Sequence, residues 1–290
     1  MKVGAAVPLA HEPVVRYSAI REFARLIEQG GLDSVWVFDH LLFRRPEQPT
    51  AGGWEAWTML SALAEATQRA ELGMLVAAVP FRNPAVFAKM IATLDEVSDG
   101  RMIAGLGAGW HQPEFDAFGI PFDHRVSRFE EAVQIIGPLL REGRVDFAGR
   151  FYQAPNCELI PRGPRPAGPP LLLAGVRPRM LDIVARHADM WNTAWHAEPA
   201  SARERLDSMR QACERNGRDP ATLDLTVGVA IAYPDLGGKS NFPNSLSDGV
   251  ADALHGYAEM GIKHVIVDVK PFTSTAIERF AEAVAQFRAH

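Results

Sequence analysis

Residues 85–105, AVFAKMIATLDEVSDGRMIAG, combine one helix, one tight turn and one strand. Residues 85–97 have the amphipathic pattern of a helix, and Ser98, Asp99 and Gly100 interrupt it. Glycine commonly ends a helix because it adopts the left-handed backbone that follows the last turn. The apolar run at 101–105 is typical of a parallel strand that is covered on both faces. The stretch therefore indicates an α/β protein.

The same unit recurs along the whole chain. We expect strands at 3–7, 34–38, 71–77, 101–105, 171–174, 190–193, 223–229 and 264–269. We expect helices at 17–29, 85–97, 128–140, 178–187, 202–216, 249–260 and 276–288. Eight strands alternating with helices predict a (β/α)₈ TIM barrel, and 290 residues are close to its usual length. A doubly wound open sheet is the main alternative, but it normally has fewer units, and no linker to a second domain is visible.

Two segments interrupt the regular alternation. Residues 143–168, between the fourth helix and the fifth strand, are rich in proline and glycine. We expect them to form an insertion that covers one side of the barrel mouth. Residues 233–247 are rich in glycine, proline, asparagine and serine, and we expect a mobile loop there.

Composition restricts the class of protein. Hydrophobic residues are 47% of the chain, charged residues are 22%, and the net charge is −5. These values are typical of a globular protein with a large core and argue against a nucleic-acid partner. No apolar run approaches the roughly 18 residues that would span a membrane. Cys157 and Cys213 stand apart and are expected to be free thiols in a cytoplasmic protein.

In this fold the functional residues gather where strands end. Asp39 and His40 follow the second expected strand. A histidine can donate or accept a proton near neutral pH, and a neighbouring carboxylate can orient it. The alternative is an aspartate that caps a loop beside an ordinary histidine.

Glycines and aromatic residues follow other strands. Gly105, Gly107 and Gly109 would let a ligand approach the backbone, but their GxGxG spacing is not the GxGxxG of dinucleotide-binding folds. Trp191 and Trp195 follow the sixth strand and could form a wall of the site, although Trp191 suits the core equally well.

The segment after the fifth strand resembles a phosphate site. Gly175, Val176 and Arg177 open a helix whose first amides could bind an anion with help from Arg177 and Arg179. Solvated arginines beside a normal helix start are an equally good interpretation. The nine histidines show no ligand spacing, so no metal site is expected.

Several stretches together resemble the luciferase-like family of flavin- and deazaflavin-dependent oxidoreductases. They are DSVWVFDHLL at 33–42, the long segment 79–136 that contains LDEVSDGR and GLGAGW, and residues 168–195. The resemblance covers nearly the whole chain in order. It implies a barrel with the cofactor ring across its mouth and a non-prolyl cis peptide near Leu75–Val76, behind that ring.

The resemblance also implies roles for single residues. His40, supported by Asp39, would be catalytic. The cofactor would contact Asp39, Leu75, Val76, Gly107, Ala108, Gly109, Gly175, Val176 and Arg177, and the substrate would contact Trp110, His111, Trp191 and Trp195. The chain departs from sugar-phosphate dehydrogenases of the family because Trp110 replaces their catalytic glutamate, and the nearest acid is Glu114. Arg128 and Phe129 resemble an Arg-Tyr element of alkanesulfonate monooxygenases, which points towards FMN.

The resemblance leaves three functions open. The first is hydride transfer between coenzyme F420 and a small organic substrate. The second is an FMN-dependent monooxygenase supplied with reduced FMN by a separate flavin reductase. The third is a barrel that binds a ligand or partner without catalysis. Family members are commonly dimers, so a homodimer is expected.

Overall fold

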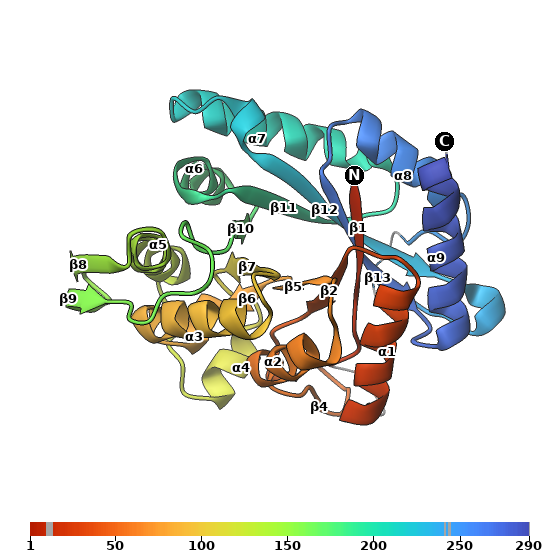
Figure 1. The fold of residues 1–290 in the computed structure, drawn as a ribbon, viewed down its shortest axis with the longest axis horizontal. Helices are drawn as coiled ribbons and strands as arrows, with labels where there is room; N and C mark the ends of the chain where they lie inside the picture. Colours follow the sequence, from red (N-terminus) through yellow and green to blue (C-terminus); the bar gives the residue numbers. More distant parts are fainter. Residues whose placement is uncertain (10–13, 241, 243–244, 290) are drawn as a thin grey trace.

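Eight parallel strands close into a barrel in the computed structural model, which describes residues 1–9, 14–240, 242 and 245–289 (Figure 1). The strands, in their order around the barrel, are β1 (Lys2–Ala6), β2 (Ser34–Val37), β5 (Glu71–Met74), β7 (Met102–Gly107), β10 (Leu171–Ala174), β11 (Met190–His196), β12 (Asp224–Ala232) and β13 (His264–Lys270). The barrel closes because β13 pairs with β1 and β10 pairs with β7. The prediction of a (β/α)₈ barrel is confirmed.

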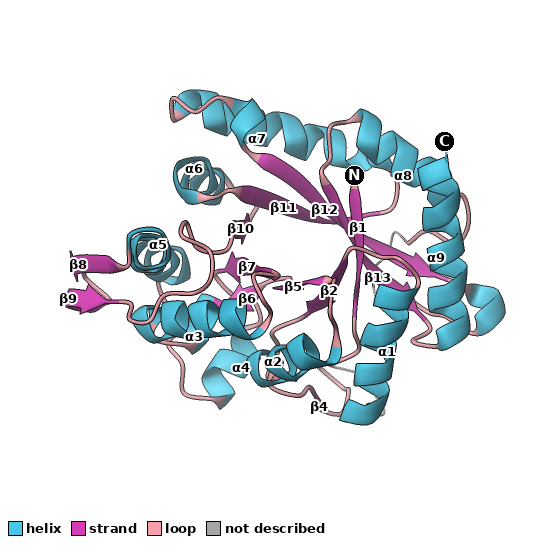
Figure 2. Ribbon diagram, viewed as in Figure 1, coloured by secondary structure: helices cyan, strands magenta, loops and turns pink. Residues whose placement is uncertain are grey.

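Helices surround the barrel (Figure 2). They are α1 (Tyr17–Gln29), α2 (Ala56–Ala66), α3 (Pro84–Val97), α5 (Arg125–Glu142), α6 (Pro178–His187), α7 (Arg203–Arg215), α8 (Val250–Glu259) and α9 (Ser274–Ala289), with a short α4 (Gln112–Ala117) after β7. Helices α2 and α4 were not predicted. The Glu55 side chain caps α2 by accepting hydrogen bonds from the amides of Trp57 and Thr58. Among the described helices, none combines the length and apolar character that crossing a membrane requires.

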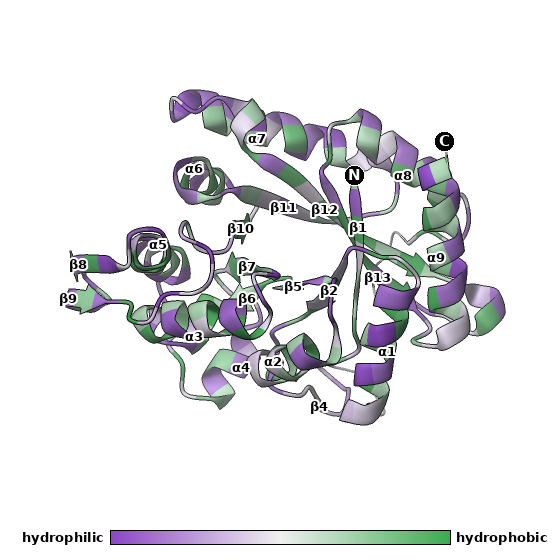
Figure 3. Ribbon diagram, viewed as in Figure 1, coloured by the Kyte–Doolittle hydropathy of each residue, from purple (hydrophilic) through white to green (hydrophobic). Residues whose placement is uncertain are grey.

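The inside of the barrel is filled below the mouth. Trp36 is fully buried there in a cluster with apolar residues of the surrounding strands: Ala6, Leu75, Ile103, Leu172, Met190 and Ile266. A Cβ atom on Gly73 would lie 2.3 Å from the Trp36 ring, so only glycine leaves room for the indole. Figure 3 shows hydrophobic residues along the strands and mixed faces on the helices. The closed floor leaves the C-terminal end of the barrel as the place for a site.

Segment 143–168 does not lie where we expected it. It forms the antiparallel hairpin β8 (Arg144–Ala148) and β9 (Gln153–Glu158), which lies beside α5 on the outside of the ring (Figure 1). The segment starts where α5 ends, and a barrel helix ends at the side opposite the mouth. An insertion at this point therefore begins far from the mouth, and it packs along α5 instead.

A second, unpredicted hairpin does reach the mouth. Strands β3 (Leu42–Phe43) and β4 (Ala51–Gly52) pair antiparallel directly after β2. The expected third strand is divided into β5 and β6 (Ala77–Ala78) by residues 75 and 76, and the peptide bond between Leu75 and Val76 is cis, as the resemblance implied.

Candidate active site

A pocket of about 790 Å³ opens at the C-terminal mouth of the barrel. Residues from strand ends and from the loops that follow them line it: Phe38, His40, Phe43, Arg45, Gln48, Pro49, Ala51, Leu75, Trp110, Trp195, Lys239, Phe242, Asp268 and Lys270. A pocket of this size is in the range that holds a cofactor ring or a small substrate. Four of the predicted site residues line it: His40, Leu75, Trp110 and Trp195.

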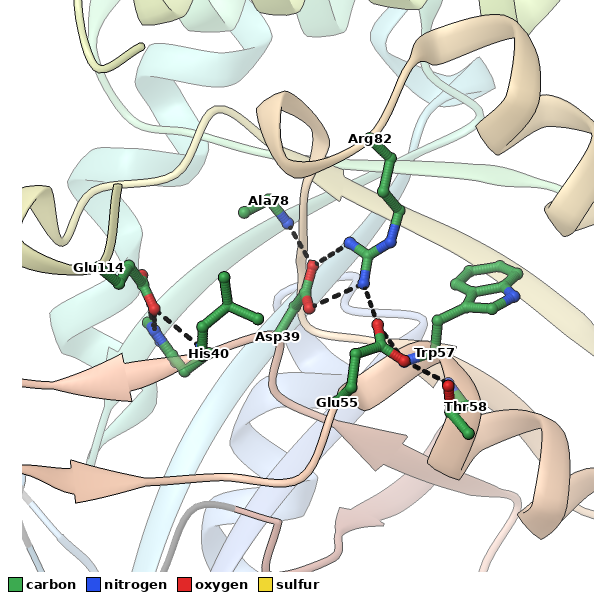
Figure 4. Close-up of polar contacts among 9 residues, drawn as sticks. Asp39, His40, Glu55, Trp57, Thr58, Ala78, Arg82 and Glu114 are labelled. Carbon is green, nitrogen blue, oxygen red and sulfur yellow. Dashed lines mark hydrogen bonds and ion pairs between the residues drawn. The ribbon is translucent and has the colours of Figure 1, made fainter. Parts of the chain in front are cut away.

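His40 is held by a carboxylate from another part of the chain. Its Nδ1 lies 3.1 Å from Glu114 Oε1, and Glu114 Oε2 accepts the amide of Leu41 at 2.9 Å (Figure 4). The Glu114 side chain is 1% exposed, whereas that of His40 is 17% exposed. A carboxylate accepts a hydrogen from Nδ1, so this contact leaves Nε2 as the ring nitrogen available to a ligand.

Asp39 does not support His40, which corrects the expectation. Its carboxylate is buried and accepts hydrogen bonds from the Ala78 amide at 2.9 Å and from Arg82 Nη1 at 2.6 Å (Figure 4). Arg82 also contacts Glu55. Burial alone would lower the pKa of Arg82, but its hydrogen bonds and charge contacts with Asp39 and Glu55 raise it. Asp39 therefore belongs to a buried network that ties β2 to the segment after β6 and to the start of α2.

Aromatic rings form much of the pocket wall. Phe43 lies 4.3 Å from the His40 ring between centroids, and Trp110 lies 5.6 Å from it. On another side, Trp195 and Phe242 stack with their centroids 4.2 Å apart. Trp110 is 63% exposed, although large aromatic side chains usually bury more of their surface. These rings offer flat apolar surfaces to a planar ligand.

Two predicted substrate contacts lie elsewhere. Trp191 is fully buried in the main core, and its Nε1 donates to the carbonyl of Gly175 at 2.8 Å. His111 is 8% exposed, and its Nε2 accepts the Arg44 amide at 3.2 Å. Burial lowers the pKa of His111. Trp191 supports the strand ends, and His111 supports the loop after β3, so neither forms part of the pocket wall.

The predicted glycines face protein atoms. A Cβ atom on Gly107 would lie 2.4 Å from Val76 Cγ2, and one on Gly109 would lie 2.4 Å from the Phe115 ring. Gly109 also has a φ of +75°, which favours glycine. Val76 packs against the cluster around Trp36, and Ala108 packs against the main core. These four residues shape the strand ends beside the pocket but are not among its lining residues.

The start of α6 is open to solvent. Gly175 is half-buried, and Val176 and Arg177 are exposed. Arg177 is the N-cap residue and makes no side-chain hydrogen bond to the first turn. Arg179 is paired with Glu130 at 2.8 Å. Free first-turn amides suit an anion, but Arg179 is already shared with a carboxylate.

The element that pointed towards FMN is occupied by protein contacts. Arg128 pairs with Asp123 at 3.0 Å, and its guanidinium lies 4.5 Å from the centroid of the Phe151 ring. Phe129 is fully buried.

Within the described part of the chain, no group of three or more histidine, cysteine and acidic side chains is placed to hold a metal.

Sequence reasoning missed four charged residues of the pocket: Arg45, Lys239, Asp268 and Lys270. The signal for two of them was present, because VIVDVK at 265–270 places two charges in an otherwise apolar strand. Parallel strands that are covered on both faces rarely carry charges without a reason. The sequence identifies Glu114 as the acid nearest to Trp110, but only the fold brings it into contact with His40.

Comparison with known proteins identifies the family. The model of the luciferase-like monooxygenase family matches residues 1–235, so the chain belongs to this family of oxidoreductases. An F420-dependent glucose-6-phosphate dehydrogenase of Amycolatopsis mediterranei is 30% identical over 73% of this chain and 64% of its own length. The pyrimidine monooxygenase RutA of Escherichia coli is 28% identical over 79% of this chain and 62% of its own length. The chain thus spans less than two thirds of the length of the curated relatives it matches.

A solved structure shares the fold over the full length. An F420-dependent secondary alcohol dehydrogenase, in complex with an F420-acetone adduct, superposes with a TM-score of 0.80 at 20% identity. The superposition covers 99% of this chain and 100% of that chain. The likeness shows the luciferase-like barrel, as the sequence resemblance implied.

Proposed function

We propose that this protein is an oxidoreductase that transfers a hydride between coenzyme F420 and a small organic substrate bound in the mouth pocket. The contact between His40 Nδ1 and Glu114 carries the proposal, because it holds one imidazole nitrogen and leaves the other for a ligand. Relatives whose names state F420 dependence support the choice of cofactor.

The protein side chains would handle the proton. His40 Nε2 would give or take a proton at the substrate atom that is reduced or oxidised, which is the usual role of a positioned histidine. Glu114 would fix the ring and its tautomer. Trp110 and Trp195 would exclude water and align the reacting molecules. When bound, the deazaflavin would supply the two-electron chemistry.

The residues at the mouth fit a flat cofactor with a phosphate. Leu75 lines the pocket together with the aromatic residues, and Val76 and residues 107–109 lie at the neighbouring strand ends. The segment that leads into α6, formed by Gly175, Val176 and Arg177, would hold the phosphate together with the free amides of the first turn of this helix. Both features lie at the carboxyl ends of the barrel strands, where ligands of this fold bind.

Titration with both cofactors tests the proposal. Purified protein is mixed with coenzyme F420 or with FMN, and binding is followed by the fluorescence of each cofactor. We expect tighter binding of coenzyme F420 and turnover without oxygen consumption. Preferential binding of reduced FMN with consumption of oxygen would overturn the proposal in favour of the alternative.

That alternative is an FMN-dependent monooxygenase that works with a separate flavin reductase. Its support is the similarity to the pyrimidine monooxygenase RutA, which is nearly as high as the similarity to the dehydrogenase. Failure to bind either cofactor would instead favour a barrel without catalysis. A cytoplasmic homodimer completes the proposal, and light scattering of the purified protein tests its mass.

A further inference from the structure

Strand β13 sends two charged side chains into the pocket. Ile266 of this strand points inward, because it belongs to the cluster around Trp36. Side chains two and four positions further along a strand face the same side. Asp268 and Lys270 therefore project from the inner face of β13 above that cluster, and both line the pocket.

The two charges form a buried pair. Lys270 Nζ lies 3.1 Å from Asp268 Oδ1, and the side chains are 13% and 5% exposed. Burial lowers the pKa of Lys270, and the Asp268 carboxylate opposes this effect. Breaking such a pair would leave a buried charge alone, so each partner holds the other in place.

The Lys270 ammonium still has hydrogen-bonding capacity. An ammonium group has three N–H donors, and Asp268 takes one of them. Nζ also lies 3.5 Å from the centroid of the Phe272 ring, whose face attracts a cation. No other acceptor lies within hydrogen-bond distance of Nζ among the described residues. A ligand oxygen in the pocket would complete this donor set.

The surrounding charge favours an anion. Lys239 and Arg45 also line the pocket, and neither makes an ion pair with a described carboxylate. Asp268 is the only acidic residue among the described lining residues, and it is already paired. The pocket is thus positively charged in a chain whose net charge is −5. Such a contrast raises the local concentration of anionic ligands.

This charged wall is separate from the open start of α6. Helix α6 follows β10, and two strands, β11 and β12, stand between β10 and β13 in the barrel. Neighbouring strands are roughly 4.8 Å apart, so the two places lie well over 10 Å from each other. A phosphate at α6 would leave Lys270 free for a second molecule.

We propose that Lys270, held by Asp268 and assisted by Lys239, binds a carboxylate group of the substrate. The aromatic side chains of the pocket hold the apolar part of the same molecule. A singly charged carboxylate suits this lysine, because Asp268 already takes one of the three N–H donors of Lys270 and offsets part of its charge. That this molecule is a substrate rests on the function proposed above, whereas the carboxylate site itself rests on the residues of the pocket alone.

Binding of matched probes to the cofactor-free protein tests this inference. Benzoate carries the charge, benzamide is its neutral counterpart of the same shape, and phenyl phosphate carries a different anion. Trp110 and Trp195 line the pocket, so quenching of tryptophan fluorescence can follow each titration. We expect benzoate to bind at least roughly tenfold more tightly than benzamide and more tightly than phenyl phosphate. Equal affinity for benzoate and benzamide, or tighter binding of phenyl phosphate, overturns the proposal.

Substitutions of the pocket lysines then test which positive charge gives the preference for benzoate. Lys270→Met should remove the preference for benzoate, and Lys239→Met should reduce it by about threefold, because this exposed charge is screened by water. Lys270→Met leaves Asp268 unpaired, so the double variant Asp268→Asn with Lys270→Met controls for misfolding and should lose the preference as well. Lys263→Met, an exposed lysine outside the pocket, should retain it. A preference that survives in the folded double variant contradicts the assignment.

Cofactor titrations of the same variants separate this proposal from the previous one. We expect the affinity for coenzyme F420 to be unchanged in Lys270→Met. A variant that loses coenzyme F420 but keeps its benzoate affinity would mean that the lysine serves the cofactor, which overturns the inference. A protein that prefers benzoate but binds neither cofactor would instead refute the proposed redox function while the carboxylate site stands.

Discussion

Asp39 and His40 are neighbours in sequence but belong to two different regions of the molecule. Asp39 points into a buried network with Arg82 and Glu55, whereas His40 lines the pocket and contacts Glu114 (Figure 4). Successive side chains of an extended chain point to opposite sides, so adjacent residues after one strand can serve different purposes. We therefore assign a role in stabilising the fold to the region around Asp39 and a role in the reaction to the region around His40.

The two regions also differ in how their carboxylates are used. Asp39 is fully buried and neutralised by a guanidinium, and Arg82 is shared with Glu55, which also caps α2. Glu114 is equally buried, but its partner is an imidazole that reaches the pocket. A carboxylate that holds a titratable, accessible group can influence a reaction, whereas one that holds a buried arginine mainly fixes the fold.

The largest expected effect concerns the pocket region. His40→Ala should reduce anaerobic turnover of coenzyme F420 by roughly 10²- to 10⁴-fold, which is the usual contribution of a general acid or base. The unfolding temperature should fall less than in Arg82→Met, because the Leu41 amide still donates to the buried Glu114 carboxylate. Absorbance of the deazaflavin measures turnover. His124→Asn, on the surface and with a backbone that asparagine tolerates, serves as the control. Equal rates for the variant and the parent would remove His40 from the mechanism.

The next effect concerns the buried region. Arg82→Met should lower the free energy of unfolding by roughly 3–5 kcal/mol, because it leaves Asp39 buried without its cation. Denaturant unfolding measures this loss. Arg279→Met removes the exposed pair with Asp235 and should cost at most about 1 kcal/mol. If the two variants were equally stable, the distinction between the regions would fail.

The smallest effect tests the link between Glu114 and His40. Glu114→Gln keeps the size of the side chain but removes the charge that fixes the imidazole tautomer. We expect turnover to fall by about tenfold and the pH profile of turnover to shift, since orientation supplies only part of the histidine's contribution. Asp116→Asn, on the same short helix and exposed, is the matched control. An unchanged pH profile would restrict Glu114 to a structural role.

The fold could be predicted because local patterns repeat. Apolar runs and amphipathic stretches located all eight barrel strands and seven helices, and α1 and α6 have the predicted bounds. Helix α2 was missed, because its moderately apolar sequence lacks a clear polar face and its cap is a glutamate, which is not a usual N-cap residue.

The site was less predictable, because its contacts join distant positions. His40 and Glu114 are 74 residues apart, and no local pattern pairs them. Sequence proximity therefore predicts Asp39 as the partner of His40, whereas in the structure Asp39 pairs with Arg82. Trp191 and Trp195 look alike in sequence, but one is buried in the core and the other lines the pocket. The positions of the strand ends in the sequence were enough to predict where the mouth lies. The direction of each side chain depends on how the barrel packs, so it could not be predicted from the sequence.

The tryptophan that blocks the barrel beneath the mouth has a consequence for the order in which ligands bind and dissociate. Because Trp36 fills the interior of the barrel, a ligand can enter the pocket only from the mouth and cannot pass through the barrel. If two ligands stack in a pocket that is closed at its base, the inner one must bind first and can dissociate only after the outer one has left. The inner ligand then cannot exchange with solvent for as long as the outer ligand stays bound.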